Sequence, residues 1–256
     1  MIKVRGNGLS IEDLLREGGL KARDNSLYYP ADSVSKPAVN NGYVSTDIPT
    51  NSMVYYAPLW LFKGSKFKTA DADKHTATVT GATWGITGRT FDGSDDQMSR
   101  TTSTLWVKDA QTPATYIIWF NSDLQGADFD STRCALAQGR TIFRFDDSSQ
   151  SGVAGTLGSF LGGAWVSSTI VPTKNTWYHA AIAHSGTSLL YYINGVLKST
   201  TANNTEAVTD VQGITVGSGQ DTQYFDGTIG EVLVYYRQLS LAEIIHHYNL
   251  SKWRYQ

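Results

Sequence analysis

The amino-acid sequence predicts an all-β fold: an antiparallel, two-sheet jelly-roll sandwich with an extended N-terminal arm and a short C-terminal helix. Short runs of β-type residues recur roughly every 8 to 15 residues, and Gly, Asn, Asp and Ser turns separate them. Only 17% of the residues are charged and 12% are aromatic, a composition typical of a β protein with exposed loops. Many short strands with regular turn signals favour a sandwich over alternating strands and helices.

Residues 1–52 differ from the rest of the chain and form a predicted N-terminal arm. Ser10 can cap a short helix whose first turn contains Asp13 and which a Gly-Gly pair ends. From residue 21 to 51 the chain is polar and has no hydrophobic periodicity, as in a flexible linker. A solvated linker rarely needs the tyrosines that this segment contains, Tyr28, Tyr29 and Tyr43. We therefore interpret the arm as a docking segment that orders on a partner.

Residues 53–256 contain the predicted sandwich and its C-terminal helix. A buried strand over 53–62 opens this region. Further strands are predicted at residues 75–84, 88–96, 114–122, 134–138, 141–147, 176–184, 188–199, 213–219 and 228–236. Asn194–Gly195 is the pair that a two-residue hairpin turn with positive φ prefers. The nearly continuous apolar run at 228–236 predicts a central strand that buries Val232 and Val234.

The end of the chain is predicted to be helical. Ser240 followed by Glu243 matches a capping box, in which the side chain of each residue binds the backbone N–H of the other. Four apolar residues at helical spacing predict one stripe that packs on the sandwich: Leu241, Ile244, Ile245 and Tyr248.

Three motifs occur in the order and at the spacing of a known family. They are "GATWGITGRTFDGSDDQMS", "NTWYHAAIAHSGTSLLYYINGVLKST" and "YFDGTIGEVLVYYRQLSLAEI". With them, the chain from about Met53 to Tyr248 resembles the laminin-G-like, concanavalin A-like jelly-roll family of lectins and glucanases. The resemblance implies the sandwich fold. It does not by itself imply an activity, because one fold hosts unrelated functions.

Many members of that family hold a calcium ion between the last strand and an early turn, using an Asp from an "I-D-E-V" motif. Gly230 occupies that position here and offers no ligand atom, whereas calcium needs six or more oxygens with carboxylates among them. We expect the site to be lost, although Asp92 or Asp226 could substitute. Glycine within a strand instead predicts that another backbone or a bulky ring comes close.

The sequence predicts no catalytic residues. Glucanases with this sandwich carry acidic residues alternating along one strand, so that two carboxylates meet the sugar about 5 Å apart. No such pattern occurs here, and the acidic pairs Asp95–Asp96 and Asp146–Asp147 sit at strand ends, where solvated turns explain them. His179 and His184 lie at odd spacing in one strand and so face opposite sides, which opposes a lyase site.

No metal or cofactor site is predicted either. The 5 histidines include only one adjacent pair, His246 and His247, and show no ligand spacing. The single cysteine, Cys134, allows no disulfide within the chain. It lies in a short apolar run and is therefore predicted to be a small buried side chain.

Lectin-like sandwiches bind glycans through rim loops, where aromatic rings stack on sugars and polar side chains bind hydroxyl groups. The predicted ligand-binding residues of this kind are Trp106, Trp165, Tyr224, Asp95 and Asp221. Each also has a plain interpretation as a core or turn residue. Trp84 and Trp177 lie in strand motifs and are predicted to belong to the core.

Charge and composition oppose several classes of partner. A net charge of −2 provides no basic field for general binding to nucleic acid or acidic membranes. The N-terminal segment is interrupted by charged side chains and lacks the apolar core of a signal peptide. No run approaches the ~20 apolar residues of a membrane helix. We therefore expect neither a nucleic-acid nor a membrane partner.

These features favour a non-catalytic, lectin-like structural or adhesion protein of a virus particle, specifically a decorating or tail-associated protein of a bacteriophage. It would assemble in the host cytoplasm, join other virion proteins through residues 1–52, and bind a cell-surface glycan. A homo-oligomer or a place in a larger assembly is expected. Two alternatives stay open: a free prokaryotic carbohydrate-binding module, and a polysaccharide-degrading glucanase or lyase.

Overall fold

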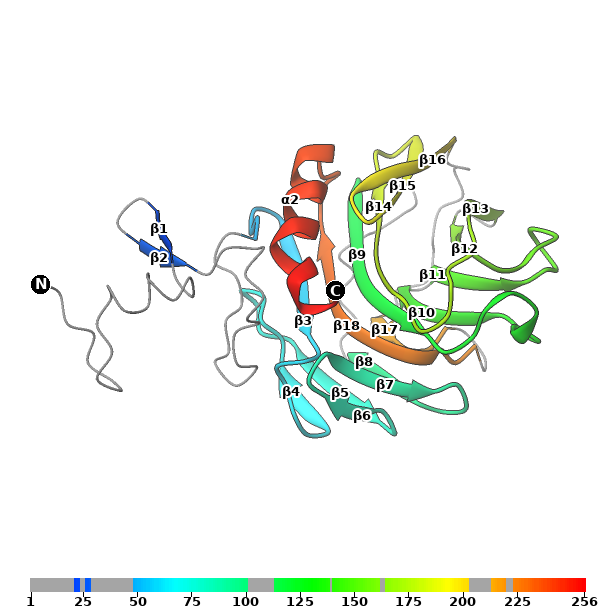
Figure 1. Cartoon of the computed structure of the whole chain (residues 1–256), viewed down its shortest axis with the longest axis horizontal. Coiled ribbons are helices and arrows are strands. Elements are labelled where there is room, and N and C mark those ends of the chain that lie inside the picture. The colour runs from blue at the N-terminus through cyan, green and yellow to red at the C-terminus, as the bar shows by residue number, and fades with distance from the viewer. Residues whose placement is uncertain are drawn as a thin grey trace, which may run out of the picture.

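The structure is a sandwich of two antiparallel sheets with one α-helix against it (Figure 1), which confirms the predicted fold class. It is a computed structural model that describes residues 21–23, 26–28, 48–100, 113–138, 140–161, 164–202, 213–219 and 223–256. Among these residues, no helix is long and apolar enough to cross a membrane.

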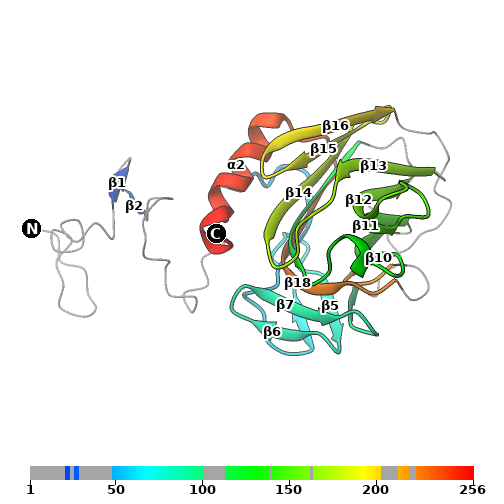
Figure 2. The ribbon, with the colours of Figure 1, turned by 45° about the vertical axis from the view of Figure 1, so that its right-hand side comes forward.

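One sheet, called the open sheet below, has no α-helix on its outer face in the described part of the chain (Figure 2). In spatial order it contains β13 (Ala164–Ile170), β12 (Ala154–Leu161), β11 (Arg140–Asp147), β10 (Arg133–Gln138), β17 (Ile214–Val216), β8 (Gln97–Arg100), β5 (Thr76–Thr80) and β4 (Lys66–Lys68). Of these, β4, β8, β12 and β13 lie outside the predicted runs. Glycines and serines dilute the apolar alternation of β12 and β13, which explains why the pattern did not reveal them.

The other sheet, called the covered sheet, packs against the C-terminal helix. In spatial order it contains β16 (Val196–Ala202), β15 (Ser188–Ile193), β14 (Trp177–His184), β9 (Ala114–Ser122), β18 (Asp226–Tyr235), β7 (Gly88–Asp92) and β6 (Thr83–Gly85), with β3 (Met53–Pro58) paired to β18. β18 is central as predicted, because it pairs with β9 along one side and with β7 and β3 along the other. Val232 and Val234 are fully buried, which confirms that prediction.

The main core lies between the two sheets and is rich in aromatic rings. Phe120 of β9 meets Phe145 of β11 with ring centroids 5.3 Å apart, and Phe145 meets Phe225 at 5.6 Å. Such contacts add to the burial of apolar area that drives the sheets together. Cys134 is also fully buried, as predicted, and burial raises the pKa of its thiol to about 12.

The hairpin between β15 and β16 turns where the sequence predicts. Asn194 and Gly195 both have positive φ, at 51° and 76°, which is the geometry of a two-residue turn that matches the strand twist. Ile193 pairs with Val196 directly across the turn.

The C-terminal helix α2 (Leu241–Ser251) begins at the predicted capping box, with Ser240 and Glu243 bonded reciprocally. The predicted apolar stripe is only partly right. Ile244 is buried, whereas Leu241 and Ile245 are exposed and His247 is buried in their place. The helix is turned so that His247 faces His179 on the covered sheet, with 2.9 Å between Nδ1 of His247 and Nε2 of His179. A 3-10 turn, η3 (Lys252–Arg254), continues the chain.

The N-terminal arm is described only in part. β1 (Lys21–Arg23) and β2 (Ser26–Tyr28) form an antiparallel pair in a stretch where no regular structure was expected. The helix predicted after Ser10 lies outside the described residues. Ile48 is buried in the apolar cluster under α2, so the packed region begins before β3.

Candidate functional site

The outer face of the open sheet presents polar groups in a row. Thr78, Ser99 and Thr215 are cross-strand partners on β5, β8 and β17, and all three are partly exposed. Cross-strand partners share one face of a sheet, so their hydroxyl groups form a ladder across it. A ladder of this kind offers hydrogen bonds to a polyhydroxylated ligand.

An aromatic and cationic cluster, named the Trp165 platform, occupies the other end of this face. It consists of Arg144 on β11, Phe160 on β12 and Trp165 on β13. Phe160 and Trp165 are direct cross-strand partners, and the Arg144 guanidinium lies 5.9 Å and 5.5 Å from their ring centroids. A Cβ atom at Gly158 would come within 2.6 Å of the Trp165 ring, so the indole lies over this glycine.

Two donors of the Trp165 platform have no hydrogen-bond partner in the described part of the chain. They are Nε1 of Trp165 and Nε of Arg144, and both are shielded from solvent. Shielded donors without partners cost free energy, and a bound ligand or water can satisfy them. Flat rings with nearby unpaired donors are an arrangement that suits a sugar.

The structure separates the predicted ligand-binding residues. Trp165 is half-buried on the open sheet, whereas Asp95 and Tyr224 lie at a rim formed by the β7–β8 turn and the start of β18. Arg133 joins the two sides of this rim, because its Nη1 donates to the carbonyl oxygens of Gly93 at 2.7 Å and of Tyr224 at 3.5 Å. Trp106 and Asp221 lie outside the described residues.

The same rim gathers carboxylates. Asp92, Asp95 and Asp96 lie close enough to share an ion, and Asp226 is the cross-strand partner of Asp92. Burial raises the pKa of Asp96, and neighbouring Asp92 and Asp95 add to the effect. Burial likewise raises the pKa of Asp226, with contributions from Asp123 and Asp92. The structure thus brings together the two residues named as substitutes for position 230, and the loss of the calcium site stays a prediction.

Gly230 itself lies in a β-bulge under the C-terminal residues. The register of β18 against β9 shifts between Ile229 and Glu231. A Cβ atom at Gly230 would lie 2.5 Å from the hydroxyl oxygen and 2.6 Å from Cζ of Tyr255. This confirms the expectation that a bulky ring approaches the glycine.

A buried polar cluster, named the His247 cluster, lies between α2 and the covered sheet. Nε2 of His179 is 2.9 Å from Nδ1 of His247, and Nε2 of His247 is 3.8 Å from Oε1 of Glu231. Tyr56 donates its hydroxyl to Oε2 of Glu231 at 3.2 Å. The guanidinium of Arg254 stacks on Trp60 beside them, 3.4 Å from the ring centroid.

Burial governs the ionisation of the His247 cluster. It raises the pKa of Glu231 from 4.5 to about 7, against the favourable charge of Arg254 and the hydrogen bond from Tyr56. It lowers the pKa of His247 from 6.5 to about 3 and that of His179 well below 6.5. Both imidazoles are therefore neutral at pH 7. Because these side chains are almost sealed from solvent, we assign them a structural role.

Carboxylates are scarce on the open sheet. Its eight described strands contain only Asp146 and Asp147, which are adjacent at the end of β11. Asp146 accepts hydrogen bonds from the backbone of Gln150 and from Ser151 and so closes the following turn. It is fully buried, however, so the prediction of a solvated turn is wrong for Asp146, as it is for the buried Asp96 of the other acidic pair. These strands therefore lack the paired carboxylates that retaining glycoside hydrolysis uses.

Comparison with known families decides the identity of the fold. The family described as the concanavalin A-like lectin/glucanases superfamily matches residues 68–245. The chain belongs to this superfamily. The resemblance seen in the sequence motifs is thereby confirmed. Comparison with curated proteins gives no match.

Solved structures of the concanavalin A-like type include enzymes and binding domains. A Trypanosoma rangeli sialidase in complex with sialic acid matches with a TM-score of 0.61 and 16% identity, over 80% of this chain and 34% of that chain. The binding domain of Paraclostridial Mosquitocidal Protein 1 matches with a TM-score of 0.61 and 15% identity, over 78% of this chain and 52% of that chain. A third match is domain 4 of AbnA, a GH43 extracellular arabinanase from Geobacillus stearothermophilus, in complex with arabinotriose. Its TM-score is 0.58 at 14% identity, over 77% of this chain and 98% of that chain.

These likenesses show the fold alone, because the identities are low. The chain spans about a third of the length of the sialidase, and the fold is shared by glycosidases and by binding domains.

Sequence reasoning missed Phe160 and Arg144 of this lectin-like sandwich. One signal was available: a Gly-Gly pair stands between "SFL" and "AWV", and two residues of this type between strands indicate a tight hairpin. In the structure β12 pairs with β13 antiparallel, which makes Phe160 the partner of Trp165. Trp84 and Trp177, predicted as core, are half-buried instead. The indole N–H of Trp84 donates to the carbonyl oxygen of Trp60 at the edge of the sandwich.

Proposed function

We propose that this concanavalin A-like sandwich is a non-catalytic glycan-binding module that uses the outer face of the open sheet. The Trp165 platform carries the proposal, because it combines two partly exposed rings with unpaired donors from Trp165 and Arg144. The C–H face of a sugar packs on an aromatic ring, and the flanking donors bind its hydroxyl or carboxylate oxygens. The hydroxyl ladder of Thr78, Ser99 and Thr215 extends this surface across the sheet.

The absence of paired carboxylates on the described strands of the open sheet supports binding without cleavage. Two of the similar structures, the sialidase and domain 4 of the arabinanase, are complexes with sialic acid and arabinotriose. Sialylated and arabinan oligosaccharides are therefore the first glycans to test, one acidic and one neutral class.

Replacing Trp165 by alanine should weaken glycan binding at least about tenfold, which corresponds to roughly 1.4 kcal/mol. The change removes the larger ring of the platform and one of its unpaired donors. Isothermal titration with the full-length protein, against glycans chosen from an array that includes both classes, measures the loss. Wild-type protein should release no reducing or unsaturated ends from the same glycans.

Trp84→Ala is the matched control for this experiment. Trp84 is also a half-buried tryptophan, but it lies on β6 of the covered sheet. If Trp84→Ala weakens binding as much as Trp165→Ala, the glycan site lies elsewhere. Reproducible cleavage that a single substitution abolishes would make the protein an enzyme.

We further propose that the module is a structural or adhesion protein of a virus particle, of the bacteriophage kind, and that the arm docks it to the other particle proteins. The arm combines several tyrosines with prolines and polar residues, a composition suited to ordering on a partner surface. The open sheet would then face outward, toward host glycans.

Deleting residues 1–47 should leave a folded, soluble sandwich that no longer joins the particle. The deletion stops before Ile48, because this residue packs in the cluster under α2. Co-sedimentation with purified particles measures incorporation, and circular dichroism checks the fold. Normal incorporation of the shortened protein would contradict the docking role. A full-length monomer that binds glycans and no particle protein would favour a free carbohydrate-binding module.

A further inference from the structure

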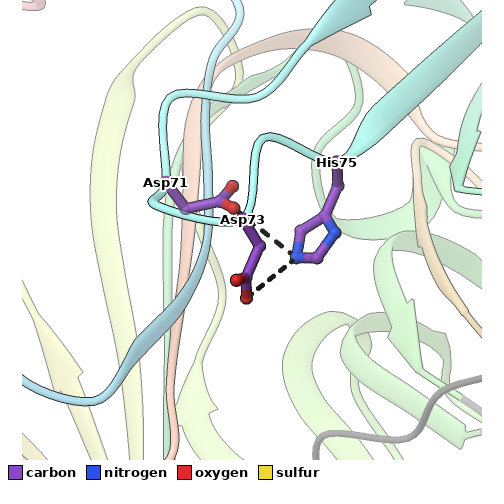
Figure 3. Close-up of side chains that lie close together, drawn as sticks. All are labelled: Asp71, Asp73 and His75. Carbon is purple, nitrogen blue, oxygen red and sulfur yellow. Dashed lines mark ion pairs between the residues drawn. The ribbon is translucent and has the colours of Figure 1, made fainter.

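Three metal-binding side chains converge in the loop between β4 and β5 (Figure 3). Asp71, Asp73 and His75 occupy alternate positions of this loop, and Figure 3 shows both carboxylates beside the imidazole ring. Nε2 of His75 lies 3.5 Å from Oδ1 of Asp71 and 3.7 Å from Oδ2 of Asp73. All three donor atoms lie within 4.8 Å of one another.

The backbone of β3 holds this loop in place. Oδ2 of Asp71 accepts a hydrogen bond from the backbone N–H of Tyr56 at 3.1 Å, and the N–H of Ala70 donates to the carbonyl oxygen of Tyr56 at 2.8 Å. Nε2 of His75 lies 3.1 Å from the carbonyl oxygen of Val54. Two of the three side chains are therefore positioned before any ligand binds, which is what a selective site requires.

Asp71 supplies a second observation, a buried oxygen that lies against His75 without accepting a hydrogen bond. Its side chain is only 1% exposed, and Oδ1, the oxygen that faces His75, has no hydrogen-bond partner in the described part of the chain. A buried carboxylate oxygen is costly unless a hydrogen bond or a cation satisfies it. The unsatisfied oxygen points at the group with which it would share an ion.

We propose that Asp71, Asp73 and His75 bind one divalent transition-metal ion, of which Zn²⁺ and Mn²⁺ are the representative cases. The ligand atoms are Oδ1 of Asp71, Oδ2 of Asp73 and Nε2 of His75. Zinc bonds to carboxylate oxygen and imidazole nitrogen are about 2.0–2.2 Å long. Donors spaced as these are need only a small rotation of Asp73, whose side chain is 67% exposed and so has room to turn.

The donor set distinguishes among metals. Calcium and magnesium prefer ligand shells made of oxygen alone, whereas an imidazole nitrogen favours transition metals. Because a ligand nitrogen must be unprotonated, the imidazole would bind the ion as the neutral tautomer that carries its proton on Nδ1, and Nε2 would give up its contact with the Val54 carbonyl.

The position of the loop indicates what the ion does. β3 belongs to the covered sheet, and β4 and β5 lie at the edge of the open sheet. An ion held by this loop therefore clamps the edges of the two sheets together. The expected consequence is a more stable sandwich, because an ion that binds only the folded state raises its stability.

The test uses full-length, untagged protein from which metals have been stripped with a chelator that is then removed. Addition of Zn²⁺ or Mn²⁺ should bind one ion per chain, measured by elemental analysis, and raise the melting temperature until the site saturates. Ca²⁺ and Mg²⁺ at the same concentrations should leave the melting temperature unchanged. If neither Zn²⁺ nor Mn²⁺ binds or raises the melting temperature at millimolar concentration, the proposal is wrong.

Two variants locate the ion. Asp73→Asn removes an exposed ligand without disturbing the bond from Asp71 to Tyr56, so the metal-free variant should melt like metal-free wild type and bind the ion at least tenfold more weakly. His75→Gln should have the same effect on binding. Asp95→Asn, in the acidic rim, is the matched control and should bind as wild type does. Unchanged binding by Asp73→Asn, or its loss in Asp95→Asn, would overturn the assignment.

Discussion

Replacing Gly230 by aspartate, the residue that the family resemblance implies at this position, should destabilise the protein by about 3 kcal/mol or more and should not create a calcium site. The new Cβ would clash with Tyr255, whose ring is buried and stacks on Trp119 with centroids 4.4 Å apart. The carboxylate would also be buried beside Glu231. Denaturant unfolding with and without Ca²⁺ measures both effects. Wild-type stability, or a large gain with Ca²⁺, would contradict this account.

A double-mutant cycle isolates the steric part of this effect. Gly230→Ala adds only a Cβ atom and should cost about 1–3 kcal/mol. In a Tyr255→Ala background the same change should cost much less, because the ring that it meets is gone. Equal costs in the two backgrounds would show that a contact other than the Tyr255 ring requires glycine here.

The glycine at this position therefore reflects packing. Where the family resemblance implies a carboxylate, this chain brings the ring of Tyr255 onto the bulge. The sequence predicted such a contact from the glycine alone, but it did not indicate the partner. The partner lies 25 residues further along the chain, and its approach depends on how α2 and η3 return to the sheet.

The fold was largely predictable because its signals are local. The Asn194–Gly195 turn, the capping box at Ser240 and the apolar run of β18 each depend on a few adjacent residues, and each is found where the sequence predicts it. Where glycine and serine interrupt the alternation, as in β12 and β13, the local signal is weak and the strands were missed.

The candidate sites depend on contacts between distant residues, which a single sequence does not reveal. The Trp165 platform needs three strands to align, and only Trp165 was recognised in advance. The His247 cluster joins residues from β3, β14, β18 and α2. Periodicity predicted an apolar stripe on the helix, but it could not show that His247 meets a polar partner on β14 and is buried there.

The dependence of stability on pH should show the second large effect, because the His247 cluster buries both acidic and basic groups. His179 and His247 have lowered pKa values in the folded protein, so below about pH 6.5 the unfolded chain binds more protons and stability is lost as the pH falls. Glu231 has a raised pKa of about 7, so the folded protein holds a proton that the unfolded chain releases above its pKa of 4.5. The contribution of Glu231 to the free energy of unfolding is therefore largest at low pH, and its dependence on pH is opposite in sign to that of the two histidines.

The contributions of His179, His247 and Glu231 do not cancel, and together they make the protein less stable as the pH falls. Between roughly pH 6 and 5, two imidazoles gain protons on unfolding while one carboxyl group loses one, so the free energy of unfolding should fall by about 1 kcal/mol per pH unit as the pH falls. The facing tyrosines, Tyr56, Tyr235 and Tyr255, have raised pKa values and stay neutral in this range. Arg254 stays charged throughout, because its lowered pKa still starts from 12.5.

Two variants separate these contributions. Glu231→Gln keeps an acceptor for Tyr56 but does not titrate, so its free energy of unfolding should fall about twice as steeply between roughly pH 6 and 5. For the same reason its free energy of unfolding should rise relative to that of the wild type between pH 5 and 8, where the buried carboxylate of the wild type becomes charged.

His247→Gln removes one imidazole, so its free energy of unfolding should depend less steeply on pH between roughly pH 6 and 5. His246→Gln, on the exposed side of the same helix, is the matched control. His246 adds only a secondary effect to the burial that lowers the pKa of His247, so this variant should still follow the wild type. Urea unfolding at half-unit steps of pH measures the slopes, and parallel curves for all four proteins would show that the buried groups do not carry the pH dependence.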